Sequence, residues 1–405
     1  MALFPEEHSE PQAQLEGPEQ QTIQPSALSF NSAQEISPGS VHLGPSEFAI
    51  PLPMDSRVKD DYERILDNKA QFIRDFVQSG NAAESEVRKA VCLFNSWLTL
   101  EQRGNLIPKV YEILEQLSNV ATHPDLNIAE HIKDSEPYLE KEAAWAEYSS
   151  AKFLFLGYLV QYGSNEDLHL AIMVQGGKTQ QIVERFLLGK GLTYTKSRQE
   201  MGDGTNLEVS MAKGSLSFGI QSTQSDRVVE TYRRPSAIVS LDRTFNAKSP
   251  SVEHMRTTFA REGSLLPVVH LLISNTSEHI ERCFHDMPAL EHLRLVMQYT
   301  VRLRDMVGDL QDNALGVSED VEEFLPCVQS DNFQLYWPLP AIEPLQIFSP
   351  EELDSAMSRS SQSDTSIESG PAPATQKRSL VSYIFASHTR YICAQTDVIA
   401  TGRHG

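Results

Sequence analysis

The sequence has few cysteines, and none of them stands at the spacing of a metal site or a redox pair. The four are Cys92, Cys283, Cys327 and Cys393, which lie far apart and form no CxxC motif. A disulfide framework and a zinc ribbon are therefore both unsupported. A reducing compartment is the default expectation for such a chain.

Long apolar runs are also lacking. The longest candidate, residues 153–160, is flanked by Lys152 and Gln161. It is far shorter than the roughly 18 residues that a membrane span needs. The first residues, MALFPEEHSEP, have neither a basic start nor an apolar stretch of the signal-peptide type. We therefore expect no membrane segment and no secretory signal.

Positive charge is scarce, with 34 Lys and Arg against 55 Asp and Glu and a net charge of −21. The acidic residues concentrate toward the ends, since residues 1–60 carry −7 and residues 311–370 carry −11. Residues 178–261 carry thirteen basic and eight acidic residues, or +5. This distribution weakens the objection to nucleic-acid binding without establishing it. Scattered charges on a solvated surface are the simpler interpretation.

Both ends of the chain have the composition of disordered segments. Residues 1–45 are rich in Gln, Glu, Pro and Ser and show no periodicity. Residues 311–405 are predicted to form an acidic, Ser/Pro-rich and largely disordered tail. The chain as a whole is 40% hydrophobic and 22% charged, which is ordinary for a globular protein. The part between the two ends can therefore bury a core.

The first ordered part, residues 46–142, is predicted to be a helical arm. Its apolar residues recur at the spacing of amphipathic helices. Pro124 ends the last of these helices, because the residue before a proline disfavours the helical conformation. A polar stretch that follows, residues 127–142, is predicted to be an exposed loop. The predicted helices cover residues 57–77, 84–97 and 106–120.

Residues 143–310 are predicted to form an α/β domain. A long helix over residues 143–161 is followed by short apolar strands that alternate with helices. Such alternation predicts a mostly parallel sheet with helices on both faces. The predicted strands cover residues 168–174, 192–195, 207–211, 237–241 and 268–273, with helices beginning at Thr179, Pro250 and His279 and a last helix over residues 288–310.

Three patterns come close to catalytic or metal motifs. The run GGKT, residues 176–179, follows a strand and opens a helix, as in a phosphate-binding loop. The full motif needs a glycine at position 172, where the chain has Ile172, so a plain helix start capped by Thr179 is favoured. The run GSLSFG, residues 214–219, is one residue too long for a nucleophile elbow, and packing at a strand edge is the better interpretation. A histidine and cysteine group over residues 279–292 is interpreted as ordinary surface and core residues. We therefore expect a protein that is not an enzyme, with no catalytic residue, cofactor or metal.

Basic residues near predicted strand ends are the candidates for contact with phosphates. Ligands of open α/β sheets gather at the carboxyl ends of the strands. The same side chains can equally be solvated, and the sequence leaves both interpretations open. The candidate DNA-binding residues are Lys178, Arg233, Arg234, Arg243, Lys248, Arg256 and Arg261.

Several separated segments resemble, in order, the second lobe of a Swi/Snf-type helicase. They include IPKVYEILEQLSNVATHPDL (107–126), LHLAIMVQGGKTQQIVERFLLGKGLTY (168–194) and AIVSLDRTFNAKSPSVEHMRTTFAREG (237–263). Thr122 replaces an asparagine of the helicase pattern. Arg256 keeps an arginine-like position, whereas the second arginine of that motif requires a gap to reach Arg261. The first helicase lobe, which carries the phosphate loop, has no counterpart.

This arrangement is similar to that of the fungal class II histone deacetylase complex subunits 2 and 3. The resemblance implies an inactive helicase-like domain that binds duplex DNA or nucleosomes in the nucleus and supports transcriptional repression. It implies two partners, the class II deacetylase catalytic subunit and a paralogous subunit. It also implies a coiled coil for assembly, but no heptad pattern follows residue 310. We therefore expect that the chain makes any partner contact through the arm and the α/β domain, or joins the complex poorly. The alternative is a helicase-derived scaffold without DNA contact.

Overall fold

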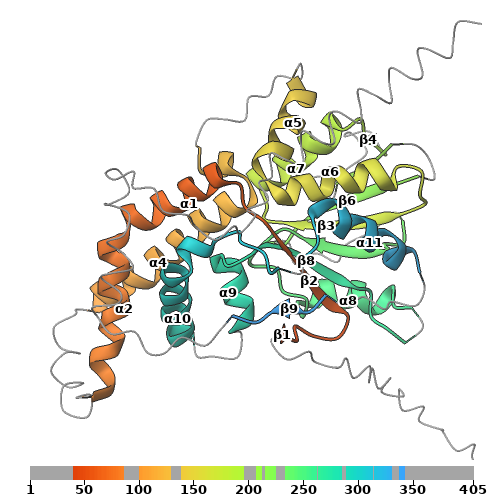
Figure 1. Cartoon of the computed structure of the whole chain (residues 1–405). Coiled ribbons are helices and arrows are strands. Elements are labelled where there is room, and N and C mark those ends of the chain that lie inside the picture. The colour runs from red at the N-terminus through yellow and green to blue at the C-terminus, as the bar shows by residue number, and fades with distance from the viewer. Residues whose placement is uncertain are drawn as a thin grey trace, which may run out of the picture. The chain divides into compact units, whose positions relative to one another are not determined.

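A seven-stranded sheet forms the centre of the computed structural model (Figure 1). Its strands lie in the order β2-β8-β7-β3-β6-β5-β4. The described residues are 40–85, 100–128, 138–195, 207–211, 215–224, 233–261, 263–284, 289–312, 314–330 and 337–342. The strands are β2 (Glu47–Leu52), β3 (His169–Val174), β4 (Thr193–Tyr194), β5 (Leu207–Ser210), β6 (Ser217–Ser222), β7 (Ala237–Ser240) and β8 (Val268–Ile273).

Five neighbouring strands, from β2 to β6 in the sheet order, are parallel, and β5 and β4 complete the sheet as an antiparallel edge. The predicted α/β class with a mostly parallel sheet is therefore confirmed. β6 was missed, because its sequence SFGIQS is too polar and glycine-rich to read as a buried strand. Every residue of β6 is nevertheless buried, and the strand lies between β3 and β5.

Helices cover both faces of the sheet, as the continuous burial of its central strands requires. One face packs against α6 (Ala151–Gly163), α7 (Lys178–Gly189) and α11 (Val317–Gln329). The apolar cluster on this face is called the sheet core below. The other face packs against α8 (Pro250–Thr258) through Val252 and Met255.

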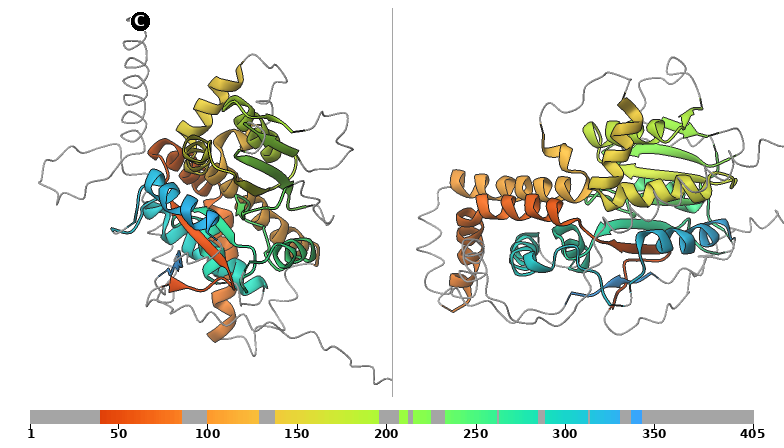
Figure 2. Two further views of the ribbon diagram at one scale, coloured as in Figure 1. Left: turned by 90° about the vertical axis from the view of Figure 1, so that its right-hand side faces the viewer. Right: turned by 45° about the horizontal axis from the view of Figure 1, so that its top comes forward.

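A second apolar cluster, called the arm cluster below, is built from helices that lie beyond one end of the strands. It joins α1 (Ser56–Asn68), α2 (Ala70–Ser85), α4 (Leu100–Thr122), α9 (Ser277–Cys283) and α10 (Ala289–Arg302). Figure 2 shows α1 and α4 side by side, in agreement with their contacts. The predicted helix over residues 57–77 is interrupted at Lys69, and most of the one predicted over 84–97 lies outside the described residues.

The boundary between arm and α/β domain differs from the prediction. Residues 47–52, assigned to the arm, form β2 and pair in parallel with β8, because backbone pairing is decided by a partner more than 200 residues away. The helix expected over 143–161 is two helices, α5 (Leu139–Ser149) and α6. They break at Ser150, whose extended backbone (φ −146, ψ 122) lets its side chain cap α6.

The predicted disorder beyond residue 310 is wrong for α11. Five apolar residues at helical spacing bury against α6 and the sheet, with Phe324 edge-on to Phe155 at 5.8 Å. The acidic composition of the segment concealed this stripe. Further on, β9 (Leu339–Pro340) pairs with β1 (Ser40–Val41). The predicted disorder is therefore also wrong for β1, which lies in the N-terminal tail. Residues 1–39, 313, 331–336 and 343–405 of the two predicted tails lie outside the described residues. Within the described helices, none is long and apolar enough to cross a membrane.

Candidate functional site

The candidate basic residues do not form one surface, because they are divided between opposite edges of the sheet. Lys178 follows the carboxyl end of β3, and Arg243 and Lys248 follow that of β7. Arg233 and Arg234 precede β7, and so lie at the amino edge of the parallel strands. A six-residue strand separates its two ends by roughly 17–20 Å. The two groups would therefore meet different parts of a bound duplex.

Arg256 is buried and bonded within the fold. Its side chain is buried, and its guanidinium donates hydrogen bonds to the carbonyl oxygens of Leu266 at 3.1 Å and Ser46 at 3.2 Å, and to that of Pro45. These bonds tie α8 to the segments that lead into β8 and β2. Burial lowers the pKa of the guanidinium from its ordinary value. The side chain lies out of reach of a phosphate in solution.

The other arginines have internal partners as well. Arg233 forms an ion pair with Asp167 and donates to Ser217 Oγ at 2.8 Å. Arg243 pairs with Glu281 at 2.6 Å. Arg261 donates to the carbonyl oxygen of Val328 at 3.4 Å, in α11. DNA contact by the seven candidates stays a prediction, and exposure favours Lys178, Arg234 and Lys248 among them.

The GGKT segment is a helix start, as the sequence favoured, but with a different cap. α7 begins at Lys178, and the cap position is Gly177, whose φ of +74 requires glycine. Thr179 is therefore not the cap; it lies in the first turn and is buried. Lys178 Nζ donates to the carbonyl oxygen of Ile128 at 3.2 Å. That contact points the lysine toward the segment after α4.

The other near-motifs are also structural. Ser217 Oγ lies 2.8 Å from His169 Nδ1, yet both residues are buried in neighbouring strands and offer no access to a substrate. His279 Nε2 lies 2.8 Å from the carbonyl oxygen of Pro340. Among the described residues, no group of three or more His, Cys, Asp or Glu side chains could hold a metal ion.

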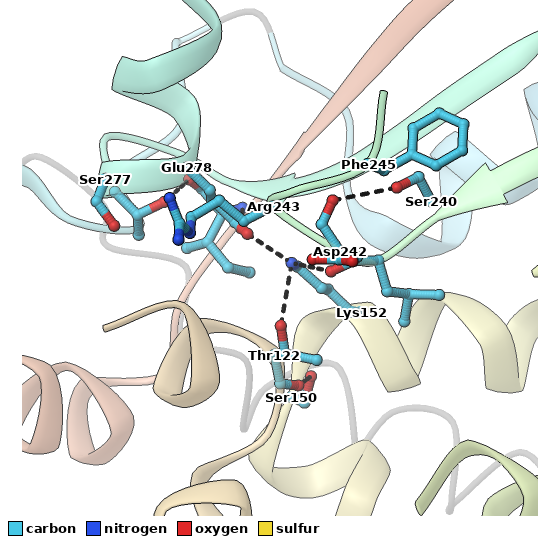
Figure 3. A network of polar contacts seen from close by, with 12 residues as sticks. Thr122, Ser150, Lys152, Ser240, Asp242, Arg243, Phe245, Ser277 and Glu278 are labelled. Atoms are coloured by element: carbon cyan, nitrogen blue, oxygen red, sulfur yellow. Dashed lines mark hydrogen bonds and ion pairs between the residues drawn. The ribbon is translucent and has the colours of Figure 1, made fainter. Parts of the chain in front are cut away.

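The most densely connected polar site was missed by the sequence interpretation. Lys152, on α6, is completely buried (0% exposed). Its Nζ donates to Glu278 Oε2 at 2.8 Å, to the carbonyl oxygen of Leu241 at 3.1 Å and to Thr122 Oγ1 at 3.4 Å (Figure 3). The three acceptors come from α9, the end of β7 and the end of α4. One ammonium group thus joins four elements.

Further bonds hold these partners in place. The second oxygen of Glu278, Oε1, accepts from the backbone N–H of Ile273 at 2.7 Å. Ser150 Oγ donates to the carbonyl oxygen of Thr122 at 2.6 Å. Nearby, the buried Tyr62 hydroxyl accepts from the N–H of Ser277 at 3.0 Å, and burial raises the pKa of this phenol. In the sequence, the sign of this site is a lone lysine, Lys152, beside the apolar run of residues 153–160. That lysine was interpreted only as the end of the run.

This network occupies the carboxyl edge of the sheet, where open α/β proteins bind ligands. A buried lysine and a buried glutamate neutralise each other there, with every donor of the ammonium used. The arrangement can hold elements together. It presents no group to a substrate, because both side chains are almost fully buried.

A surface groove of about 450 Å³ lies next to the network. It carries two exposed apolar side chains, Ile128 and Trp145, and Trp145 Nε1 donates to Asp125 Oδ2 at 3.2 Å. At its side the Arg57 guanidinium lies 4.1 Å from the ring centre of Tyr148. The lining comes from α1, the end of α4, the short helix η1 (Pro124–Asn127) and α5, namely Arg57, Val58, Asp61, Arg64, Ile65, Val120, Pro124, Asp125, Asn127, Ile128, Trp145 and Ser149.

Comparison with known proteins gives a family match. Residues 43–328, more than half of the chain, match the family model described as class II histone deacetylase complex subunits 2 and 3. A curated relative, HDA1 complex subunit 3 of Saccharomyces cerevisiae, is 24% identical over 253 residues. The match covers 59% of this chain but only 37% of that relative.

Among solved structures, one shows the same fold. A chain from structural and functional studies of the yeast class II Hda1 HDAC complex aligns with a TM-score of 0.57 and 19% identity, covering 77% of this chain and 99% of that one. A Sulfolobus solfataricus SWI2/SNF2 ATPase core in complex with dsDNA aligns with a TM-score of 0.38 and 12% identity, covering 65% of this chain and 50% of that one.

Proposed function

The chain belongs to the family of class II histone deacetylase complex subunits 2 and 3, and from this membership we propose that it is a non-catalytic subunit of a class II histone deacetylase complex. Its partners are then the deacetylase catalytic subunit and a paralogous subunit, and it acts in the nucleus in transcriptional repression. The family match over residues 43–328 carries this proposal, because it includes both the arm cluster and the sheet.

The state of the sheet edge supports a non-catalytic role. The carboxyl edge of β7 is occupied by the ammonium of Lys152, which is bonded to Leu241 and Glu278. Beside it, Arg243 is paired with Glu281. These charged side chains are bonded to one another and are not presented to a phosphate. The edge acts as a structural joint.

We propose the groove between α1, α4 and α5 as the contact surface for the deacetylase catalytic subunit. Its exposed Trp145, the neighbouring Tyr148 and Arg57 are residue types that concentrate binding energy at protein interfaces. The groove also draws on both parts of the fold, the arm cluster and the helices of the sheet core. It therefore matches the expectation that partner contacts are made through the arm and the α/β domain.

Co-purification tests the proposal. The full chain is co-expressed with a class II deacetylase catalytic subunit and a paralogous family member, and the tagged chain is recovered. We expect the deacetylase in the eluate. The variants Trp145→Ala and Ile128→Glu are expected to reduce its recovery by about tenfold or more, as for hot-spot residues. Tyr111→Ala, which removes an equally exposed aromatic side chain outside the groove, serves as the control.

Two results are informative against the proposal. If the wild-type chain recovers no deacetylase, its role as a subunit is refuted. If the groove variants and Tyr111→Ala recover equal amounts, the subunit role stands but the groove is not the contact surface.

A further inference from the structure

Two apolar clusters lie next to each other in this protein, with Met54 packed against both, and a polar network joins the elements that carry them. The arm cluster is centred on residues such as Tyr62, Leu117 and Val296, and the sheet core on residues such as Phe153 and Leu170. Apolar contact is non-directional, so directional bonds between two such bodies add specificity to the way they pack. The polar network is where such directional bonds are made.

Lys152 is the centre of that network. Its bond to Thr122 reaches the end of α4, and its bond to Glu278 reaches the start of α9, and both helices belong to the arm cluster. Its own helix, α6, and its third acceptor, the carbonyl of Leu241, belong to the sheet side. Two of the three bonds therefore join the sheet side to the arm cluster, and the third lies within the sheet side.

The physics of buried ion pairs separates stability from specificity. Removing two charges from water costs about as much as their attraction returns, so an uncharged pair of similar shape is often neutral or stabilising. Removing one charge alone is strongly destabilising, because the other remains buried without a partner. A buried pair is therefore weak evidence for stability, whereas its directional bonds can select one arrangement among several.

We propose that the Lys152–Glu278 pair, together with Thr122, sets the orientation of the arm cluster on the sheet rather than the stability of the fold. The surface groove takes its shape from this orientation. Its walls include Arg57 and Val120 from the arm helices and Trp145 and Ser149 from α5, which packs on the sheet side. A change of arm angle would move one wall against the other. The inference concerns the fold and stands whether or not the proposed function holds.

The test is the double variant Lys152→Met with Glu278→Gln in the full chain. It removes both charges, keeps the length of the side chain at position 278, shortens the one at position 152 by one atom, and leaves an amide oxygen to accept the N–H of Ile273. Spin labels are placed through a keto amino acid at Tyr111 of the arm and Met211 of the sheet, both exposed, so the native cysteines remain. Pulsed electron paramagnetic resonance then measures the distance between the label on the arm and the label on the sheet.

We expect the wild-type chain to give one narrow distance distribution. The double variant should stay folded, with a midpoint of thermal unfolding close to that of the wild type, and its distance distribution should be about twofold broader or clearly shifted. Thr122→Val, which keeps the charges paired and removes only the bond to α4, should broaden the distribution to a smaller extent. Lys152→Met alone should be much less stable than the double variant.

The control is Lys190→Met with Glu147→Gln, at a partly exposed ion pair. That ion pair has the same 2.8 Å length but joins α7 to α5 on the sheet side. It should leave the arm-to-sheet distribution unchanged. The proposal is overturned if the double variant keeps the narrow wild-type distribution, or if it unfolds, since the pair would then act on packing or stability alone.

Discussion

At the scale of single residues, two histidines are buried in the sheet as neutral imidazoles. Burial, and then the charge of Arg233, lowers the pKa of His169 from 6.5 to about 4. Burial, and then Arg282, lowers the pKa of His270 to about 4 as well, against the opposing effect of Glu47. A lowered pKa in the folded state means that the unfolded chain takes up protons first as the pH falls.

The first prediction is therefore acid sensitivity between pH 6.5 and 4. The free energy of unfolding should be highest above pH 6.5 and should fall below it by up to about 1.4 kcal/mol per pH unit for each histidine. Urea unfolding at pH 7, 6 and 5 measures this slope. His169→Asn keeps a donor and acceptor near Ser217 Oγ but cannot titrate, so it should show a shallower slope. Equal slopes for both proteins would contradict the assignment.

The second prediction concerns Asp320 in α11. Burial, and then the neighbouring Glu323 and Glu319, raises the pKa of this carboxyl group from 3.8 to about 7. Because the pKa of Asp320 is raised in the folded state, the free energy of unfolding decreases as the pH rises from about 4 through 7. Asp320→Asn should therefore stabilise the chain at pH 8 by on the order of 1 kcal/mol and change little at pH 4. Thermal unfolding of the wild type and of Asp320→Asn at pH 4 and pH 8 tests this prediction. Glu322→Gln, at an exposed position, is the control.

At the scale of elements, α11 is an integral part of the sheet core. Phe324 is completely buried and packs against the rings of Phe155 and Trp337 at 5.8 and 6.2 Å. Phe324→Ala should lower the free energy of unfolding by about 3–5 kcal/mol, since it removes a buried aromatic ring and leaves a cavity. Glu323→Ala, at the exposed neighbouring position, should change the free energy of unfolding little. If the two substitutions were equally mild in denaturant unfolding, α11 would not be docked as described.

The β3–α7 connection leads to a second expectation at this scale. Ile172 stands, buried in β3, where a phosphate loop needs glycine, and Lys178 is bonded to the Ile128 carbonyl. The segment therefore lacks the wrapped loop that surrounds phosphates. Calorimetric titration of the full chain with ATP and magnesium should show no heat of binding. Micromolar binding that Lys178→Ala abolishes would show that the segment is a nucleotide site.

At the scale of the whole molecule, duplex DNA binding stays a prediction, and the structure sharpens its test. Binding should be weak, independent of sequence and steeply reduced by salt, because it would rest on neutralised phosphates. The exposed lysines of the carboxyl edge, Lys178 and Lys248, can share one contact. Lys178→Glu with Lys248→Glu and, separately, Arg234→Glu test the two edges, and substitutions at an edge that meets the duplex should lower affinity alike for all duplexes.

A gel-shift series at low and moderate salt measures these affinities. If the wild-type chain shifts no duplex even at low salt, the scaffold without DNA contact becomes the better account. Arg233→Glu is unsuitable as a probe, because Arg233 is bonded to Asp167 and Ser217 and its loss would disturb the fold.

Local pattern in the sequence determined many of the elements and the fold class. The run HLAIMV and the run VVHLLI are apolar enough to be buried strands wherever they lie, and both were placed correctly as β3 and β8. The proline after Ser249 predicts the start of α8 from backbone geometry alone. The ordered motifs also indicated the family. Apolar runs and helix starts depend on residues that are adjacent along the chain, so they can be predicted from the sequence.

Only the tertiary structure decided which side chains act together. β2 joins the sheet through a partner more than 200 residues away, and β6 is a strand because β3 and β5 flank it. Lys152 meets Glu278 across 126 positions, and Arg256 meets the carbonyl of Ser46 across 210. Burial and pairing arise from contacts that are distant along the chain. For that reason a charge pattern could not distinguish an arginine that faces solvent from one that holds the fold together.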